Sequence, residues 1–306
     1  MSRLSPHQSV INYNAGGKQD RLMLGILLMA IGETLIVFSG AAIKHVTHEL
    51  PIAQVVFFRS LFGLMFLLPI ILKFGVGRLK TQKLGTHFLR GLFGLIAMFC
   101  MFYSFYSLKL TEAILLKATS PIMLSVVALL ILGERLSIQA VLAIGLAFIG
   151  VLIIVNPAEF NPVIGLGFLA GAVSAFTAAF AKTMVRRLGQ TENSDIIVFY
   201  FLSIGAVLSL PLLAVYWQNP TLEQWGWLAL LAALSTAGQI GITKAFSVAK
   251  AGQVAMFTYL SMPVAGILGW VFWAEQITLP LLIGTMVIVT AGIISVLSNQ
   301  KKSSDS

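Results

Sequence analysis

Long hydrophobic segments separated by short polar ones follow one another along almost the whole chain. Each segment has roughly the 20 residues that an α-helix needs to cross the hydrocarbon core of a bilayer. Strands of an outer-membrane barrel would instead alternate polar and apolar residues over about 10 positions. The pattern therefore predicts an all-α integral membrane protein with ten transmembrane helices. Their expected ranges are 22–43, 52–73, 88–108, 112–132, 138–155, 164–183, 196–216, 226–247, 253–273 and 279–297.

The composition agrees with this class. Hydrophobic residues make up 58% of the 306 residues and charged residues only 10%, which leaves too little polar surface for a soluble domain. Residues 1–21 are polar and are expected to form a disordered cytoplasmic tail, and residues 298–306 are expected to form a cytoplasmic tail at the other end. Residues 22–297 should hold all of the membrane-spanning structure.

A repeat divides this region into two halves. The segment 111–157 has an apolar helix with a proline, an acidic residue at its end, a short turn and a helix rich in Gly and Ala, and the segment 253–295 follows the same plan. Pro121 matches Pro263, and Glu134 matches Glu275. We expect the prolines to kink their helices and the glutamates to cap turns at the membrane surface. A period this long indicates duplication.

The two repeats are expected at residues 22–157 and 158–297, with five spans in each. An odd number of spans makes the second copy enter the membrane from the opposite side, so the repeats should be inverted. Inverted repeats around a central site are the architecture of carriers that work by alternating access.

Basic residues indicate the orientation. If both termini are cytoplasmic, only Lys44 and Lys109 fall in segments on the opposite side of the membrane, whereas most of the 20 Lys and Arg residues fall on the cytoplasmic side. This bias predicts cytoplasmic N and C termini in a bacterial-type inner membrane. The net charge of +9 then suits the anionic inner leaflet, and no nucleic-acid partner is needed to explain it.

Several motifs resemble a known family. They are FFRSLFGLMFLLP in the second span, LRG at the start of the third, and the proline helices that end in GERLS and AEQIT. Over residues 22–297 the chain resembles the EamA-type family of the drug/metabolite transporter superfamily. The segments around Arg59, His87–Gly91 and Lys244–Ser247 are similar to the branch that includes S-adenosylmethionine uptake carriers. The resemblance implies transport, with many substrate classes among its members.

Three charged residues fall well inside predicted spans, where each costs about 2.5 to 3.5 kcal/mol on insertion scales. Glu33, Arg59 and Lys117 are predicted to meet in one substrate cavity, where Glu33 binds a cationic group or a proton and the bases hold a carboxylate. The alternative is a fixed salt bridge between helices. Arg90 and Lys244 lie near cytoplasmic helix ends and are interpreted as snorkelling anchors.

Aromatic residues crowd the third and ninth spans. Tyr103 and Tyr259 are the two predicted to meet a substrate, because each offers a ring and a hydroxyl group. The alternative interpretation for most of these rings is an interfacial belt or a lipid-facing surface.

No nucleotide-binding glycine loop, cluster of metal ligands or nucleophile with a histidine partner is found, so neither an enzyme nor a cofactor nor a metal is expected. The sequence predicts a secondary transporter of a small polar or zwitterionic metabolite, such as S-adenosylmethionine or another ring-bearing compound. An amino-acid or drug exporter and a channel-like facilitator are the alternatives. Protons are a candidate coupling ion, and no feature argues for a homodimer.

Overall fold

The computed structural model describes residues 6–132, 138–154, 162–249, 254 and 256–304, and every regular element in these ranges is a helix. The predicted all-α fold is therefore confirmed. The first half contains α1 (Pro6–Thr47), α2 (Ile52–Phe74), η1 (Val76–Leu79), α3 (Leu84–Ser107), α4 (Leu110–Ala118), α5 (Ser120–Leu132) and α6 (Ile138–Ile154). The second half contains α7 (Pro162–Leu188), α8 (Ser194–Val215), α9 (Leu222–Val248), η2 (Met256–Leu260), α11 (Ser261–Trp273) and α12 (Leu279–Ser304).

Six helices of the described chain are long and apolar enough to cross a membrane: α1 from Arg21 onward, α2, α3, α7, α8 and α9. The apolar parts of α6, η2 with α11, and α12 are shorter. Helix α1 differs from the expectation at its start, because it begins at Pro6 within the segment that was predicted to be a disordered tail. Extending an existing helix costs less free energy than nucleating a new one. The membrane-spanning part of α1 can therefore continue as a helix beyond the bundle.

The fourth and ninth predicted spans are each interrupted near a proline. Helix α4 ends before Thr119, whose hydroxyl donates to the Leu116 carbonyl over 2.7 Å, and α5 begins at Ser120. Pro121 lacks the N–H that a continuous helix would need at that point. Pro263 is the third residue of α11, which follows the 3-10 turn η2. The two prolines therefore lie at corresponding breaks in the two halves.

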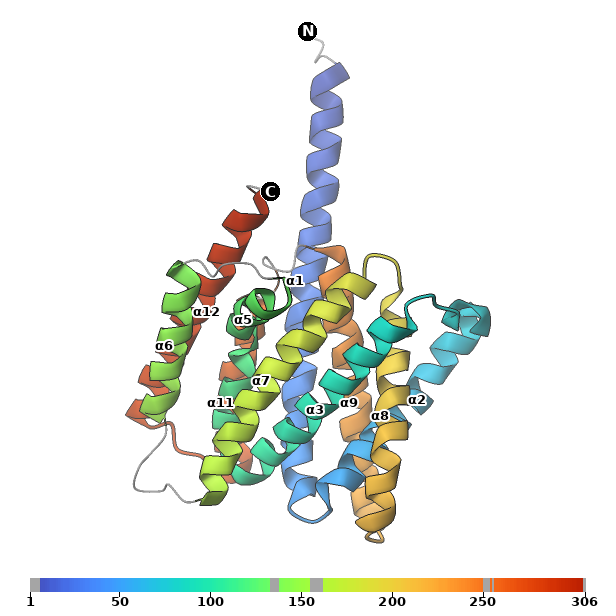
Figure 1. The fold of residues 1–306 in the computed structure, drawn as a ribbon, viewed down its shortest axis with the longest axis vertical. Helices are drawn as coiled ribbons and strands as arrows, with labels where there is room; N and C mark the ends of the chain where they lie inside the picture. The colour runs from blue at the N-terminus through green and yellow to red at the C-terminus, as the bar shows by residue number, and fades with distance from the viewer. Residues whose placement is uncertain (1–5, 133–137, 155–161, 250–253, 255, 305–306) are drawn as a thin grey trace.

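Helices of the first half pack mainly on helices of the second. Helix α1 packs on α9 and α3 on α7, while α2 pairs with α8, α4 with α11 and α6 with α12. Helices α1 and α7 run in opposite directions, and both chain termini lie at the same end of the bundle (Figure 1). We call this the terminal end, and the opposite end, which carries Lys44, the distal end. In the pairs α1–α9 and α3–α7, the first long helix of each half packs on the third long helix of the other half.

Close approach of α1 and α9 occurs through glycines. A Cβ atom at Gly32 would lie 2.9 Å from the Gly238 carbonyl oxygen, and one at Gly238 would lie 2.8 Å from the Gly32 oxygen. Small residues allow membrane helices to pack this closely. The contact brings α9 against α1 one residue before Glu33.

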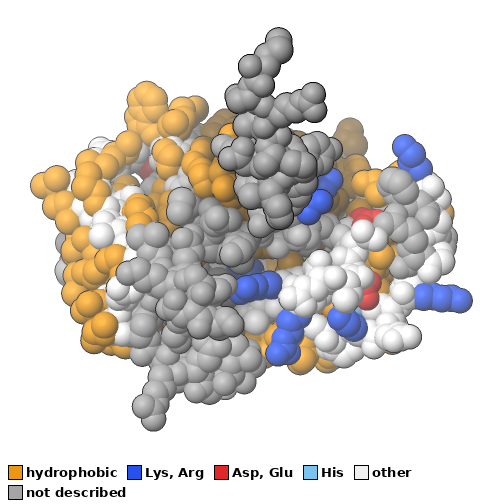
Figure 2. Space-filling model, turned by 90° about the horizontal axis from the view of Figure 1, so that it is seen from above, with side chains coloured by type: hydrophobic (Ala, Val, Ile, Leu, Met, Phe, Trp, Pro, Cys, Tyr) orange, Lys and Arg blue, Asp and Glu red, His pale blue; other side chains and the backbone are white. Residues whose placement is uncertain are grey.

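The largest hydrophobic cluster fills the distal half of the bundle, where α1, α2, α3, α4, α9 and α11 meet. It includes Val46, Phe58, Phe105, Leu110 and Leu228. Figure 2 shows the molecule from the terminal end, with basic side chains on the face that looks toward the viewer. Exposed basic residues near this end include Lys73, Lys80, Lys83, Arg186 and Arg187.

Candidate functional site

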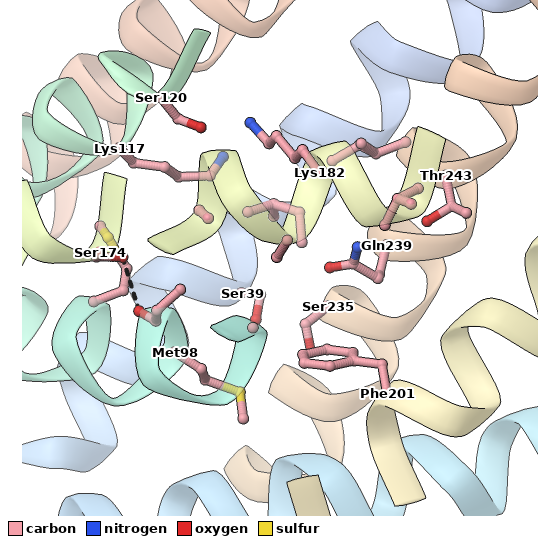
Figure 3. A pocket seen from close by; sticks show the side chains of 18 of the residues that line it. Ser39, Met98, Lys117, Ser120, Ser174, Lys182, Phe201, Ser235, Gln239 and Thr243 are labelled. Carbon is pink, nitrogen blue, oxygen red and sulfur yellow. Dashed lines mark hydrogen bonds between the residues drawn. The ribbon is translucent and has the colours of Figure 1, made fainter. Parts of the chain in front are cut away.

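A cavity of about 180 Å³ lies between the two halves of the bundle and is lined by residues of α1 to α5 and α7 to α9. Figure 3 shows side chains that point into it from α1, α3, α7, α8 and α9. Its charged lining residues among those described are Glu33, Arg59, Arg90, Lys117 and Lys182. Charged groups from five different helices therefore meet in one place.

Glu33 and Lys117 form an ion pair in this cavity. Lys117 Nζ donates to Glu33 Oε2 over 2.5 Å, and the Glu33 side chain is 1% exposed. Lys117 is the second-last residue of α4 and is 19% exposed, so its amine keeps access to the cavity. The structure thus brings together two of the three charged residues that the sequence places in the membrane.

Arg59 reaches the same cavity from α2. The residue is 4% exposed, and its Nε donates to the hydroxyl of Ser235 on α9 over 3.1 Å. The guanidinium carbon lies 5.1 Å from the centre of the Phe201 ring, a distance suited to a cation–π contact. Within the described chain, Arg59 Nη1 is buried without a hydrogen-bond partner.

Arg90 also lines the cavity, and its interpretation as a snorkelling anchor is wrong. It is 4% exposed, its guanidinium carbon lies 4.1 Å from the Phe201 ring centre, and its buried Nε has no hydrogen-bond partner among the described residues. The predicted span started at residue 88, whereas α3 begins at Leu84, so Arg90 lies farther from the helix end than expected. Lys244 is exposed on α9 and does not line the cavity. Its position is compatible with the interpretation as a snorkelling anchor.

Lys182 is a second residue that the sequence analysis did not assign to the site. Helix α7 continues to Leu188, five residues beyond the predicted end of that span, and this places Lys182 inside the bundle. Its half-buried side chain lies within electrostatic range of Glu33, Lys117 and Arg90. The amines of Lys117 and Lys182 point into the same part of the cavity (Figure 3).

A second ion pair lies at the distal end. Glu275 accepts hydrogen bonds from the backbone N–H of Leu110 over 2.5 Å and of Thr111 over 3.2 Å, and from the Thr111 hydroxyl over 2.9 Å. Lys44 Nζ lies 3.9 Å from the same carboxylate and donates to the Leu108 carbonyl. Glu275 therefore caps the N-terminus of α4 in the other half, whereas the sequence suggested a local turn. We call Lys44 and Glu275 the distal ion pair.

The two predicted tyrosines do not line the cavity. Tyr103 is half-buried on α3, with its ring 6.2 Å from that of Tyr106. Tyr259 is 8% exposed in η2 and packs in a hydrophobic cluster with Leu115 and Met262. The aromatic residues that line the cavity are Phe102, Phe105, Phe201 and Phe246. The substrate contact predicted for the tyrosines stays a prediction.

The remaining predicted residues are placed as follows. Glu134, the other predicted turn cap, lies outside the described residues. Pro121 and Pro263 lie at the helix interruptions described above. Among the described residues, no three His, Cys, Asp or Glu side chains gather as a metal site would require.

A duplicated bundle of apolar helices, with buried charges in a cavity between its halves, defines the class of multi-pass membrane transporters for small molecules. The model described as the EamA-like transporter family matches residues 23–156 and 165–297. The chain belongs to this family, and the two matches coincide with the two repeats.

Named relatives are transporters. The chain is 31% identical over 284 residues to the pseudopaline exporter CntI of Pseudomonas aeruginosa, covering 92% of this chain and 99% of that protein. It is 29% identical to the S-adenosylmethionine uptake transporter of Rickettsia bellii, over 84% of this chain and 88% of that one. A riboflavin transporter of Vibrio cholerae is 28% identical, over 77% and 79% of the two chains. A solved crystal structure with 19% identity and a TM-score of 0.63, covering 88% of this chain and 96% of the other, shares the fold.

Proposed function

We propose that the chain is a secondary transporter that moves a small polar or zwitterionic metabolite across a bacterial-type inner membrane by alternating access. In this proposal ten spans form two inverted five-helix repeats (residues 22–157 and 158–297), and both termini are cytoplasmic. The basic surface of the terminal end supports this orientation, because basic residues favour the cytoplasmic side (Figure 2). The shorter helices then complete the count, with α4 and α5 as one span and η2 and α11 as another.

The observation that carries the proposal is a cavity with buried charges that is closed at one end. Residues of its lining that lie deepest toward the distal end, such as Ser39 and Arg59, are at most 4% exposed. Residues nearer the terminal end, such as Lys182 and Phe246, are partly exposed. The distal ion pair and the largest hydrophobic cluster lie beyond the buried end. This asymmetry supports a carrier whose cavity opens toward the cytoplasm.

Glu33, Arg59 and Lys117 are the residues we propose for substrate binding or coupling. The Glu33 carboxylate is paired with Lys117, and protonation of Glu33 would release the amine, so a proton is our candidate coupling ion. Named relatives transport S-adenosylmethionine, pseudopaline and riboflavin, and these compounds are therefore the first candidates to test.

The test is flux in proteoliposomes that contain the purified protein. A panel of radiolabelled metabolites, including S-adenosylmethionine, riboflavin, amino acids and organic acids, is offered with and without an imposed pH gradient. We expect saturable uptake of at least one compound and its loss in Glu33→Gln. Absence of flux for every compound would refute the proposed function.

Counterflow separates the proposed carrier from a channel-like facilitator. A carrier exchanges labelled for unlabelled substrate and accumulates the label transiently, because one cavity is presented to each side in turn. Flux that does not saturate and shows no counterflow would favour the facilitator. Outward flux of amino acids or drugs would favour the alternative exporter function of the same family.

A further inference from the structure

Positive charge exceeds negative charge in the central cavity. Its described lining includes four basic side chains and one carboxylate, and this carboxylate, Glu33, is already paired with Lys117. Among the residues that the structure describes, Arg59, Arg90 and Lys182 have no carboxylate within ion-pair distance. In the described part of the chain, these three positive charges therefore have no ion-pair partner of their own.

Two of these charges belong to guanidinium groups, which stay protonated at neutral pH. Arg59 and Arg90 are each 4% exposed, so water compensates them poorly. Leaving a buried charge unpaired is costly, and charged residues inside membrane proteins are usually functional. An anion in the cavity would remove this cost.

The two arginines are arranged around a common ring. Their guanidinium carbons lie 5.1 and 4.1 Å from the centre of the Phe201 ring, which keeps both groups at the cavity wall. Arg59 Nη1 and Arg90 Nε are buried donors without a partner in the described chain. Donors of this kind match the acceptor oxygens of a carboxylate or a phosphate, which guanidinium groups bind in a fixed geometry.

Lys182 supplies a separate positive charge from the second repeat. Arg59 lies about two turns from the distal start of α2, whereas Lys182 lies near the end of α7 that approaches the terminal end. Both line the same cavity, and Lys182 is partly exposed. A molecule between them meets one positive group at its deep end and another toward the opening.

We propose that the substrate is a small organic anion with at least two acidic groups, carboxylate or phosphate, one held by Arg59 and Arg90 beside Phe201 and another by Lys182. This substrate class rests on the proposed transport function of the same cavity. It makes a compound of net positive charge, such as S-adenosylmethionine, a poor substrate. Among the polar and zwitterionic metabolites predicted as substrates, the proposal therefore selects those that have more acidic groups than basic ones.

The experiment measures thermal unfolding of the full-length protein in detergent with four probes. Glutarate is the dicarboxylate, 3-phosphoglycerate combines a phosphate with a carboxylate, glutaramide is the neutral match of glutarate, and 1,5-diaminopentane is the matched dication. We expect stabilisation by glutarate or by 3-phosphoglycerate and none by the neutral and cationic probes. Stabilisation by glutaramide equal to that by glutarate would overturn the proposal, as would no stabilisation by either anion.

Variants connect the effect to the residues. Arg59→Gln, Arg90→Gln and Lys182→Gln should each weaken the apparent affinity for the stabilising anion by about tenfold to a hundredfold, the usual effect of losing a hydrogen bond to a charged group. Lys244→Gln removes the same charge from an exposed position of α9 and should leave the affinity unchanged. Unchanged affinity in all three cavity variants would overturn the proposal.

Two further measurements keep the test decisive. Arg90→Lys retains the charge, so it should preserve the preference for glutarate over glutaramide even if packing changes, whereas Arg90→Gln should lose that preference. Flux is then measured with the same probes. Anion binding without any flux would refute transport but not the substrate class, and flux of neutral or cationic compounds without anion binding would refute the substrate class but not transport.

Discussion

Replacing Glu33 by glutamine tests whether its ion pair with Lys117 serves transport or only holds α1 against α4. Glutamine keeps nearly the same shape and a hydrogen-bond acceptor but removes the negative charge. The 2.5 Å contact leaves no room for water between the two groups, so the variant removes a direct interaction. We expect the variant to fold, to lose stability and to lose transport.

The magnitude follows from the burial of the two partners. At an effective dielectric constant of about 20, two charges at this separation attract by about 6 to 7 kcal/mol, and desolvation offsets much of this. Breaking a buried pair by removing one partner usually costs about 3 to 5 kcal/mol. Glu33 is 1% exposed but Lys117 is 19% exposed, so its amine regains some hydration. We therefore expect a loss of unfolding free energy of about 2 to 3 kcal/mol.

The assay compares Glu33→Gln, Lys117→Gln and the double variant by unfolding in detergent and by flux in proteoliposomes. The double variant leaves no unpaired charge, so its stability should exceed that of either single variant. All three should lack transport if the charges handle the substrate or a proton. Normal transport by the double variant would refute this role and identify the pair as a structural salt bridge.

Three further predictions use matched controls. Glu275→Gln breaks the distal ion pair and should lower the unfolding free energy by about 1 to 3 kcal/mol, whereas Glu223→Gln at an exposed helix start should change it by less than about 0.5 kcal/mol. Gly238→Ala pushes a methyl group against a carbonyl of α1 and should cost about 1 to 3 kcal/mol, while Gly226→Ala meets nothing within 4 Å and should not destabilise. Burial and neighbouring basic groups lower the pKa of His48 below its ordinary value of 6.5, so the unfolded chain binds the proton better and stability falls as the pH drops through 6.5. Unfolding temperatures from pH 8 to 5.5 should show this fall, and it should be smaller in His48→Gln.

The hydropathy pattern predicts the helices and the repeat well because both depend on local sequence. Apolar runs of about the length of a membrane span predict the helices, and the prolines Pro121 and Pro263 mark where two of these helices are interrupted. The meeting of Glu33 and Lys117 could also be predicted, since isolated charges in apolar segments need partners. These features need only distances along the chain.

Features that depend on helix ends were harder to predict. Arg90 and Lys182 lie near the ends of their predicted spans, where an error of a few residues at a helix boundary moves a side chain by about one turn. An earlier start of α3 and a later end of α7 place both residues in the cavity. The signal that could have found them is that each lies within an otherwise apolar run.

Contacts between segments that are far apart in the chain could not be predicted from the sequence. Glu275 caps a helix that begins 165 residues earlier, and nothing local to its own turn indicates that partner. Phe201 on α8 likewise contacts Arg59 on α2 and Arg90 on α3, and no local sequence pattern indicates that these three residues meet. Such contacts follow from the packing of the two halves on each other, which the repeat predicts only in outline.

The two repeats match in sequence but differ in environment. Lys44 and Lys182 each lie in the last two turns of the first helix of a repeat, yet Lys44 is 7% exposed and paired with Glu275 while Lys182 is half-buried in the cavity. Inverted repeats exchange arrangements when a carrier opens to the other side, so we interpret the difference as a property of one conformation. If this is right, Glu275→Gln should speed the labelling of a cysteine placed at Ile43, a buried cavity residue near the distal end, and equal labelling rates would contradict it.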